Sequence, residues 1–292
     1  YQLMWLDRWK ARRALRRKAI PEVLWNHALT ALPFLHELEP GELRHLRTLS
    51  SLFLDHKQFT GVNGFEVTDQ VALLVAVQAC LPLLHMAPEN RPWMALEWYD
   101  DFVGIVMQPS EVVARRTTHD DSGVVHYYTE VIDGEAMEGG PVMLSWPMVA
   151  DAAVLAMDGY NLVIHEFIHK MDMRNGPADG CPPLPSGFMG HANRSSVYQE
   201  WNQTWGVAYD DFRQQVIMYQ RFGAPPPWLD AYAASAPAEF FAVACEAYFV
   251  NRTMFTRNFP TLVPLLDAFF NPEGGTVPLQ AVSYTHLRAH ET

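Results

Sequence analysis

Cysteine is scarce in this sequence, and the way it is used excludes two classes of protein. The 292 residues include three cysteines, Cys80, Cys181 and Cys245, which are odd in number and far apart. They form neither a disulfide framework nor a CxxC metal-binding pair. Because this usage fits a reducing compartment, we expect a cytoplasmic protein.

Long apolar runs and an excess of positive charge are also lacking. The longest apolar run, Val71 to Leu84, is interrupted by Gln78 and Pro82 and is too short to cross a bilayer. No secretory signal is recognisable at the start of the sequence. Acidic residues outnumber basic ones by 33 to 21, and the net charge of −12 argues against nucleic-acid binding. We therefore expect a soluble protein with neither an integral membrane segment nor a nucleic-acid partner.

The sequence pattern changes twice along the chain, which predicts an α+β fold. The first 95 residues read as helical, and Thr68 is expected to cap an apolar helix that runs to about Leu84. Three runs rich in β-branched and aromatic residues then predict strands of a small, mostly antiparallel sheet: Phe102–Val106, Val124–Thr129 and Pro141–Leu144. Helices are expected again at roughly 147–157, 160–173, 196–221, 237–250 and 260–270.

These changes divide the chain into two structural parts and a tail. We expect a helical N-terminal region, residues 1–95, packed on a catalytic domain, residues 96–282. The last ten residues, 283–292, read SYTHLRAHET and resemble a translated sequencing-adapter tail. We take this tail to be non-native and exclude His286 and His290 as metal ligands.

The helix expected from about Asn161 to Arg174 carries the residues that suggest chemistry. One of its faces is apolar, and the neighbouring face holds His165, His169 and Asp172 at positions i, i+4 and i+7. Two imidazoles one turn apart can bind one zinc ion, as in HExxH sites. Glu166, between them, is then placed to act as the general base on the attacking water.

A chance HExxH on an ordinary surface helix is the competing interpretation, since the pentapeptide alone has false positives. Leu162, Val163 and Ile164 come directly before it, however, and predict a deeply packed helix. A charged Glu166 in such a helix needs a reason to be there. The context therefore favours metal binding.

A catalytic zinc normally has three protein ligands, so a third ligand must come from elsewhere. The long metzincin pattern would need histidine where this chain has Asn175, which excludes that class. We expect Asp172 to support the site or the helix end rather than to bind metal. Glu239 begins the helix expected at 237–250 and is the preferred ligand, but spacing alone does not separate this role from a first-turn glutamate that complements the helix dipole. Three further candidates stay open: Asp179, His191 and Glu200.

Several motifs together resemble the Mlc titration factor A family of zinc-dependent peptidases. The likeness is strongest around the HExxH helix, from Gly159 to Gly176, where Ile168 and Met171 depart from the usual apolar residues without affecting a site role. It extends over most of the chain through five more segments: Gly64–Glu66, Ala79–Leu84, Gly140–Trp146, Asp230–Ala234 and Ala238–Val243.

The resemblance implies a zincin-like fold in which His165, His169 and Glu239 bind one Zn²⁺ and Glu166 is the catalytic base. It also implies a role for Tyr232, because the peptidase domain of anthrax lethal factor is similar here and has a tyrosine at the same offset from its metal-binding glutamate. A phenol hydroxyl at that place can donate to the oxyanion formed during hydrolysis. Without the resemblance, Tyr232 reads as a packing aromatic. Glu246 is left as either a partner of the ligands or a solvated carboxylate.

Two functions follow from these observations. The first is a zinc-dependent peptidase, aminopeptidase-like, that cleaves small peptide or aminoacyl substrates. By analogy with zincin folds, the strand at Pro141–Leu144 would line its cleft, and a substrate could add there as an extra strand. The family resemblance also implies binding and sequestration of the Mlc transcriptional repressor of sugar uptake. The alternative to an enzyme is therefore a non-catalytic regulatory protein that titrates Mlc, with a structural or vestigial metal site.

Overall fold

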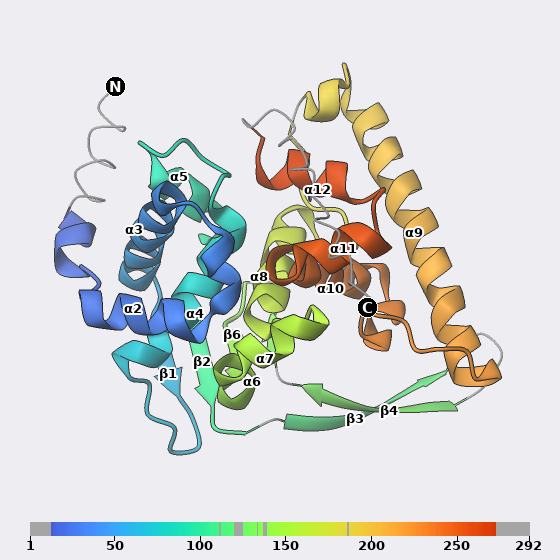
Figure 1. Cartoon of the computed structure of the whole chain (residues 1–292), viewed down its shortest axis with the longest axis horizontal. Coiled ribbons are helices and arrows are strands. Elements are labelled where there is room, and N and C mark those ends of the chain that lie inside the picture. Colours follow the sequence, from blue (N-terminus) through green and yellow to red (C-terminus); the bar gives the residue numbers. More distant parts are fainter. Residues whose placement is uncertain are drawn as a thin grey trace, which may run out of the picture.

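The computed structural model describes residues 13–110, 112–119, 125–132, 134–136, 139–185 and 187–272, the short stretches between 112 and 136 by their backbone only. The tail predicted at 283–292 lies outside the described residues. Within them, the N-terminal helices lie on one side of the molecule, the long helix α9 (Arg194–Phe222) forms the opposite edge, and helices α8 (Leu162–Asp172) and α10 (Pro237–Val250) lie between (Figure 1).

The N-terminal part consists mainly of α2 (Glu22–Ala31), α3 (Pro40–His56), α4 (Asp69–Cys80) and the short α5 (Pro92–Ala95). Helix α3 begins with a reciprocal cap, in which the backbone N–H of Glu39 donates to the Glu42 carboxylate over 2.7 Å. Helix α4 begins as predicted, since the hydroxyl of Thr68 accepts from the backbone N–H of Val71. Both helices are therefore defined locally by the residues at their starts.

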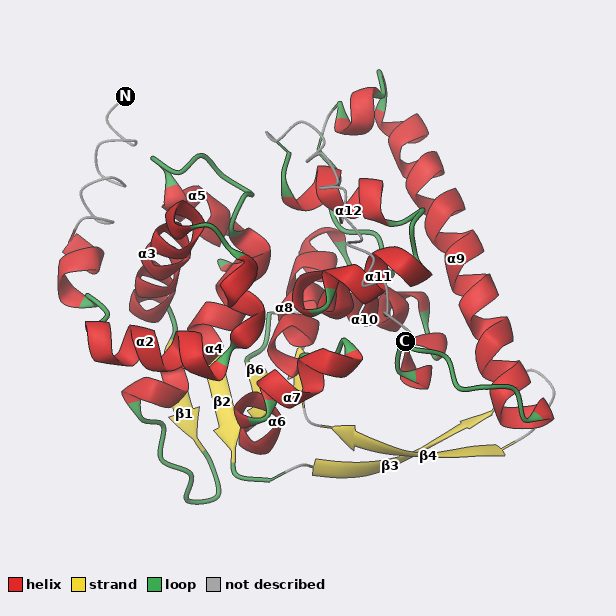
Figure 2. Ribbon diagram, in the orientation of Figure 1, coloured by secondary structure: helices red, strands yellow, loops and turns green. Residues whose placement is uncertain are grey.

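The main sheet is mostly parallel, so the prediction of a mostly antiparallel sheet was wrong. Its order is β1 (Gln58–Gly61), β2 (Gly104–Gln108), β6 (Val142–Ser145) and β5 (Gly134–Ala136), with β1, β2 and β6 parallel (Figure 2). Among the described strands, antiparallel pairing is confined to β5 beside β6 and to a separate pair, β3 (Val112–His119) with β4 (Val125–Ile132). The error arose because the residues of a strand do not show its direction, which here is set by long crossover connections that return the chain in the same direction.

Strand β1 was missed because it is four residues long and lies in a stretch read as wholly helical. Its backbone pairs with β2 from Gln58 opposite Gly104 to Gly61 opposite Met107. The division of the chain at residue 95 stays a proposal. With that division, β1 belongs to the N-terminal region in sequence but pairs with β2 in the sheet of the catalytic part.

The C-terminal part is helical, as predicted. The segment expected at 147–157 forms two short helices, α6 (Trp146–Ala150) and α7 (Ala152–Leu155), followed by a 3-10 turn, and the chain ends its described course in α11 (Arg252–Asn258) and α12 (Val263–Phe270). The observed bounds of α8, α9 and α10 match the predicted ranges within a few residues. None of the helices in the described ranges is both long and apolar enough to span a membrane.

Helix α8 lies in the core, where aromatic side chains from α3 and from the segment just before β2 surround Phe167. The ring of Phe167 packs against Phe53, Tyr99 and Phe102, with centroids 5.6, 4.8 and 5.8 Å away. On the other side, Trp201 and Trp205 of α9 pack on Phe241 of α10. The two helices that carry the candidate site are thus held between the N-terminal helices and α9.

Candidate active site

Helix α8 is an interior helix, which contradicts the reading of its HExxH as a surface pentapeptide. All its residues except His169 are buried. The helix starts at Asn161, whose side-chain oxygen accepts from the backbone N–H of Ile164 over 2.9 Å. This cap and the apolar packing fix the direction in which the histidines project.

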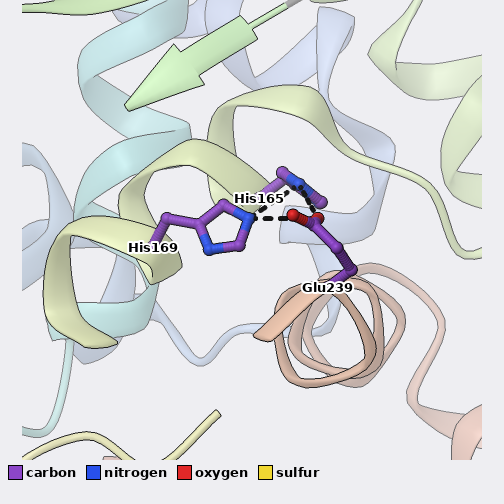
Figure 3. A group of neighbouring side chains, drawn as sticks. All are labelled: His165, His169 and Glu239. Atoms are coloured by element: carbon purple, nitrogen blue, oxygen red, sulfur yellow. Dashed lines mark hydrogen bonds and ion pairs between the residues drawn. The ribbon is translucent and has the colours of Figure 1, made fainter. Parts of the chain in front are cut away.

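His165 and His169 from α8 and Glu239 from the first turn of α10 point toward one another (Figure 3). The Nε2 atoms of the histidines are 3.1 Å apart, and each lies 3.2 Å from Oε2 of Glu239. Ligand atoms about 2.0–2.1 Å from a tetrahedral zinc would be separated by about 3.3 Å, so this triangle has the size that such an ion requires. Among the described residues, the three form a group of metal-ligand side chains whose ligand atoms all lie within 4.8 Å of one another.

Glu246 determines which nitrogen of His165 faces this triangle. Its carboxylate is fully buried and accepts from His165 Nδ1 over 2.7 Å, which leaves the Nε2 lone pair directed at the site. The backbone N–H of Asn161 donates to the other carboxylate oxygen over 2.5 Å. Glu246 is therefore not the solvated carboxylate that the sequence left open.

The charges around His165 change its protonation in the metal-free site. Burial lowers the pKa of His165, but the carboxylates of Glu246 and Glu239 outweigh burial and hold this pKa well above its usual value. The pKa of Glu239 is lowered, because hydrogen bonds from His165 and His169 outweigh the effect of its burial. A proton on His165 thus occupies the lone pair that a metal ion would use.

Glu166 is the next residue along α8, and its side chain is almost completely buried. Burial raises the pKa of this carboxyl, while the neighbouring His165 and His169 act in the opposite direction. A carboxylate with a raised pKa is a stronger base than one in free solution. The environment of Glu166 therefore suits a group that accepts and returns a proton.

Tyr232 lies beside the site, in a 3-10 turn (Ala231–Ala234) just before α10. The centroid of its ring is 6.4 Å from that of His165. The Asp230 carboxylate accepts from the backbone N–H of Tyr232, and the hydroxyl of Tyr209 on α9 donates to the carbonyl of Ala234 over 3.0 Å. Hydrogen bonds therefore hold both ends of the turn, and the phenol ring lies next to His165, a candidate ligand.

Asp172 stabilises the end of α8 and is not part of the ligand group. Its buried carboxylate accepts from the backbone N–H of Gly180 over 2.8 Å, and burial raises the pKa of this carboxyl to about 6. Gly180 has a φ of +85°, and a Cβ atom there would lie 2.8 Å from the carbonyl oxygen of Pro237. Asp172 therefore holds a loop that packs directly against the start of α10, two residues before Glu239.

The other three candidate ligands lie apart from the triangle. His191 contacts Glu200, which is on α9, and the carboxylate of Asp179 accepts from the backbone N–H of Cys181.

Sequence reasoning had overlooked the roles of Asn161 and Gly180 in holding the site. An asparagine directly before an apolar helix is a cap signal that could have identified Asn161.

Strand β6 does not offer the free edge that the sequence predicted at Pro141–Leu144. It pairs with β2 on one side and with β5 on the other, so a substrate strand cannot add to it. The edge of the main sheet on this side is β5, which also contacts α8. The sequence prediction failed here because β5 is a three-residue strand without a recognisable pattern.

Comparison with known proteins identifies relatives of this sequence. The family model described as glucose-regulated metallo-peptidase M90 matches residues 6–271. The chain is 32% identical over 266 residues to Mlc titration factor A of Escherichia fergusonii, covering 91% of each chain, and 32% identical over 268 residues to Mlc titration factor A of Klebsiella pneumoniae, again with 91% of each covered. A protein of the same name from Escherichia coli is 31% identical over 279 residues, which are 95% of this chain and 94% of the relative. The resemblance inferred from the motifs is confirmed, and the chain belongs to the glucose-regulated metallo-peptidase M90 family.

Proposed function

We propose that this protein is a zinc-dependent peptidase whose metal ligands are His165, His169 and Glu239. The observation that carries the proposal is the triangle of ligand atoms with sides of 3.1 and 3.2 Å. Two imidazoles and one carboxylate are a donor set typical of catalytic zinc, which keeps a further position for water or substrate. The bond from His165 to Glu246 supports the same assignment, because zinc-binding histidines usually donate their second nitrogen to a carboxylate or carbonyl.

The residues around the triangle have distinct parts in the proposed hydrolysis. Bound zinc would polarise the scissile carbonyl and make water a stronger nucleophile at neutral pH. Glu166 takes a proton from the attacking water as the new C–O bond forms, and it passes that proton to the leaving amine as the C–N bond breaks. The hydroxyl of Tyr232 donates to the oxygen on which negative charge develops. Glu246 keeps His165 oriented throughout.

The substrate is proposed to be a short peptide or an aminoacyl amide, bound along β5. An extended peptide can add to a free sheet edge through main-chain hydrogen bonds, and β5 provides that edge beside α8. This placement is an analogy with other zincin-like folds. The preference for small, aminopeptidase-type substrates comes from the family resemblance. We further propose a cytoplasmic location, which is supported by the three buried, unpaired cysteines.

Two variants test the proposal together. Wild-type protein should contain about one zinc per chain after purification, and Glu239→Ala should contain little, because a site of two histidines binds zinc weakly. Glu166→Gln should keep its zinc but lose hydrolysis of aminoacyl and short peptide substrates. Glu200→Gln is the matched control, since it alters a carboxylate that is paired with His191 outside the triangle. Full activity in Glu166→Gln would contradict its assignment as the base, and equal zinc in Glu239→Ala would remove it as a ligand.

A second candidate function is the binding of a regulatory protein. The relatives are named Mlc titration factor A, and we propose that this chain also binds the Mlc repressor. Such binding needs no hydrolysis, so a Glu166→Gln protein should bind purified Mlc as well as wild type does. Binding by a protein that neither holds zinc nor cleaves peptides would favour a purely regulatory role with a vestigial metal site. Absence of binding by wild type and variant alike would contradict this second function.

A further inference from the structure

Four buried polar residues form a hydrogen-bonded network that runs from α4 to the metal triangle, with one link made by a backbone N–H. The side-chain amide nitrogen of Asn161 donates to Gln78 Oε1 over 2.7 Å. The backbone N–H of Asn161 donates to Glu246, which in turn accepts from His165 Nδ1. Gln78 and Glu246 are 0% exposed and Asn161 is 1% exposed, so solvent does not compete for these bonds.

Each amide in this network has its orientation fixed by its neighbours. The side-chain nitrogen of Gln78 donates to the carbonyl of Leu74 over 2.9 Å, which turns its oxygen toward Asn161. That oxygen selects the nitrogen end of the Asn161 amide. The oxygen end of Asn161 is then free to cap α8 at Ile164. Gln78 therefore determines how Asn161 sits at the start of the metal-binding helix.

The position of Asn161 matters for the site because its backbone N–H is the second donor to Glu246. A carboxylate held by two donors on α8 has a fixed orientation, whereas one held only by His165 can rotate about its side-chain bonds. Gln78 is also the one polar side chain in the buried part of α4, from Val71 to Cys80, where burial of an amide is unfavourable unless its hydrogen bonds are satisfied. The bonds to Leu74 and Asn161 satisfy it.

We infer that Gln78 is a positioning residue for the metal site, acting through Asn161 and Glu246 on His165. The inference rests on the proposed function, and it extends the site into the N-terminal helices. Helix α4 contacts α8 directly, so the path is short and lies within one packed core. Gln78 itself touches neither a ligand nor a reacting atom.

The first test compares zinc affinities of Gln78→Met and a control variant in the full-length protein, measured by competition with a chromophoric chelator. Methionine has a similar length but neither a strong donor nor a strong acceptor, so Asn161 loses its partner. We expect affinity to fall about tenfold, the lower end of the range known for partners of metal ligands. The control, Leu73→Ala, creates a cavity beside the same helix but leaves the hydrogen bonds from Gln78 to His165 in place. It should leave the zinc affinity unchanged. Melting temperatures of the metal-free proteins show whether stability alone explains the result.

The second test asks whether Gln78 acts through Asn161. Asn161→Ser keeps a hydroxyl that can cap α8 but lacks the amide that reaches Gln78. It should weaken zinc binding about as much as Gln78→Met, and the double variant should be no weaker than either single one. The visible absorption of the Co²⁺-substituted proteins should differ from wild type in both single variants and be unchanged in Leu73→Ala.

The outcomes separate the inference from the proposed function. Wild-type protein that binds no zinc would overturn the proposed function and the inference with it. Tight zinc binding by wild type and Gln78→Met alike would overturn the inference alone. An equal loss of affinity in Leu73→Ala would assign the effect to general destabilisation, and additive losses in the double variant would show that Gln78 does not act through Asn161.

Discussion

Replacing Glu246 by glutamine should weaken zinc binding while changing the size of the side chain very little. The carboxylate accepts two hydrogen bonds, from His165 Nδ1 and from the backbone N–H of Asn161. A glutamine has one oxygen and one NH₂ group, so it can accept only one of the two bonds. Whichever way the amide turns, one N–H on α8 faces another N–H group.

The magnitude follows from these two bonds. A hydrogen bond to a charged group contributes about 1.5–3 kcal/mol and one to a neutral group about 0.5–1.5 kcal/mol, so losing the charge removes about 1 kcal/mol. The donor that is left unpaired adds about 1 kcal/mol more. The sum of about 2 kcal/mol corresponds to a roughly thirtyfold loss of zinc affinity. This lies within the range of about 10–100-fold that is typical of residues next to metal ligands.

Chelator competition on wild type, Glu246→Gln and the control Glu200→Gln would measure this loss. All three proteins should be folded, as judged by circular dichroism, and the control should bind zinc as wild type does. If Glu246→Gln also bound zinc with wild-type affinity, the bond from Glu246 would not set the orientation of His165. The explanation of the triangle given above would then be wrong.

Three further predictions concern Tyr232, the loop at Gly180 and the protonation of the metal-free site. Tyr232→Phe should lower kcat about a hundredfold or more with zinc content unchanged, because one donor to the oxyanion is lost; an unaltered kcat would leave Tyr232 as a packing residue. Gly180→Ala should lower both the melting temperature and zinc affinity because its Cβ meets Pro237, whereas Gly187→Ala, which has a positive φ but no atom within 4 Å, should affect stability alone. In the metal-free protein the raised pKa of His165 contributes stability that is complete below about pH 6.5 and is lost as the pH rises through its folded pKa, so the melting temperature should fall as the pH rises above about 6.5. Zinc affinity should rise over the same range because the proton on His165 is lost, and a melting temperature that rises with pH would contradict the assignment.

The residues of α8 were the part of the site that local sequence could predict. Histidines at i and i+4 beside an apolar face indicate both a helix and a common direction, so the HExxH motif and its apolar context were enough to select His165, Glu166 and His169 as candidates. Glu239 is 70 residues from His169, and nothing in local spacing brings the two together. What joins them is tertiary packing, through Asp172, the Gly180 loop and the start of α10.

Strand pairing was predicted less well because it depends on the connections rather than on the strands. The residues of β2 and β6 were identified as strands, but their direction relative to each other is set by the long excursion through β3 and β4. Short strands such as β1 and β5 contribute too few residues to show alternation. The missed strand β5 also changes where a substrate strand is proposed to bind, because the free edge of the sheet lies at β5 instead of β6.

Gln78 illustrates a signal that was present in the sequence but read for another purpose. As an interruption of an apolar run, it argued against a membrane span. The same reasoning has a second consequence, because an amide buried among apolar side chains must find partners, and those partners mark a place where the core is organised around polar groups. Here the partners lead through Asn161 and Glu246 to His165. A polar residue inside an apolar helix is therefore a reason to search for the polar network that it completes, even when the helix is far in sequence from the candidate site.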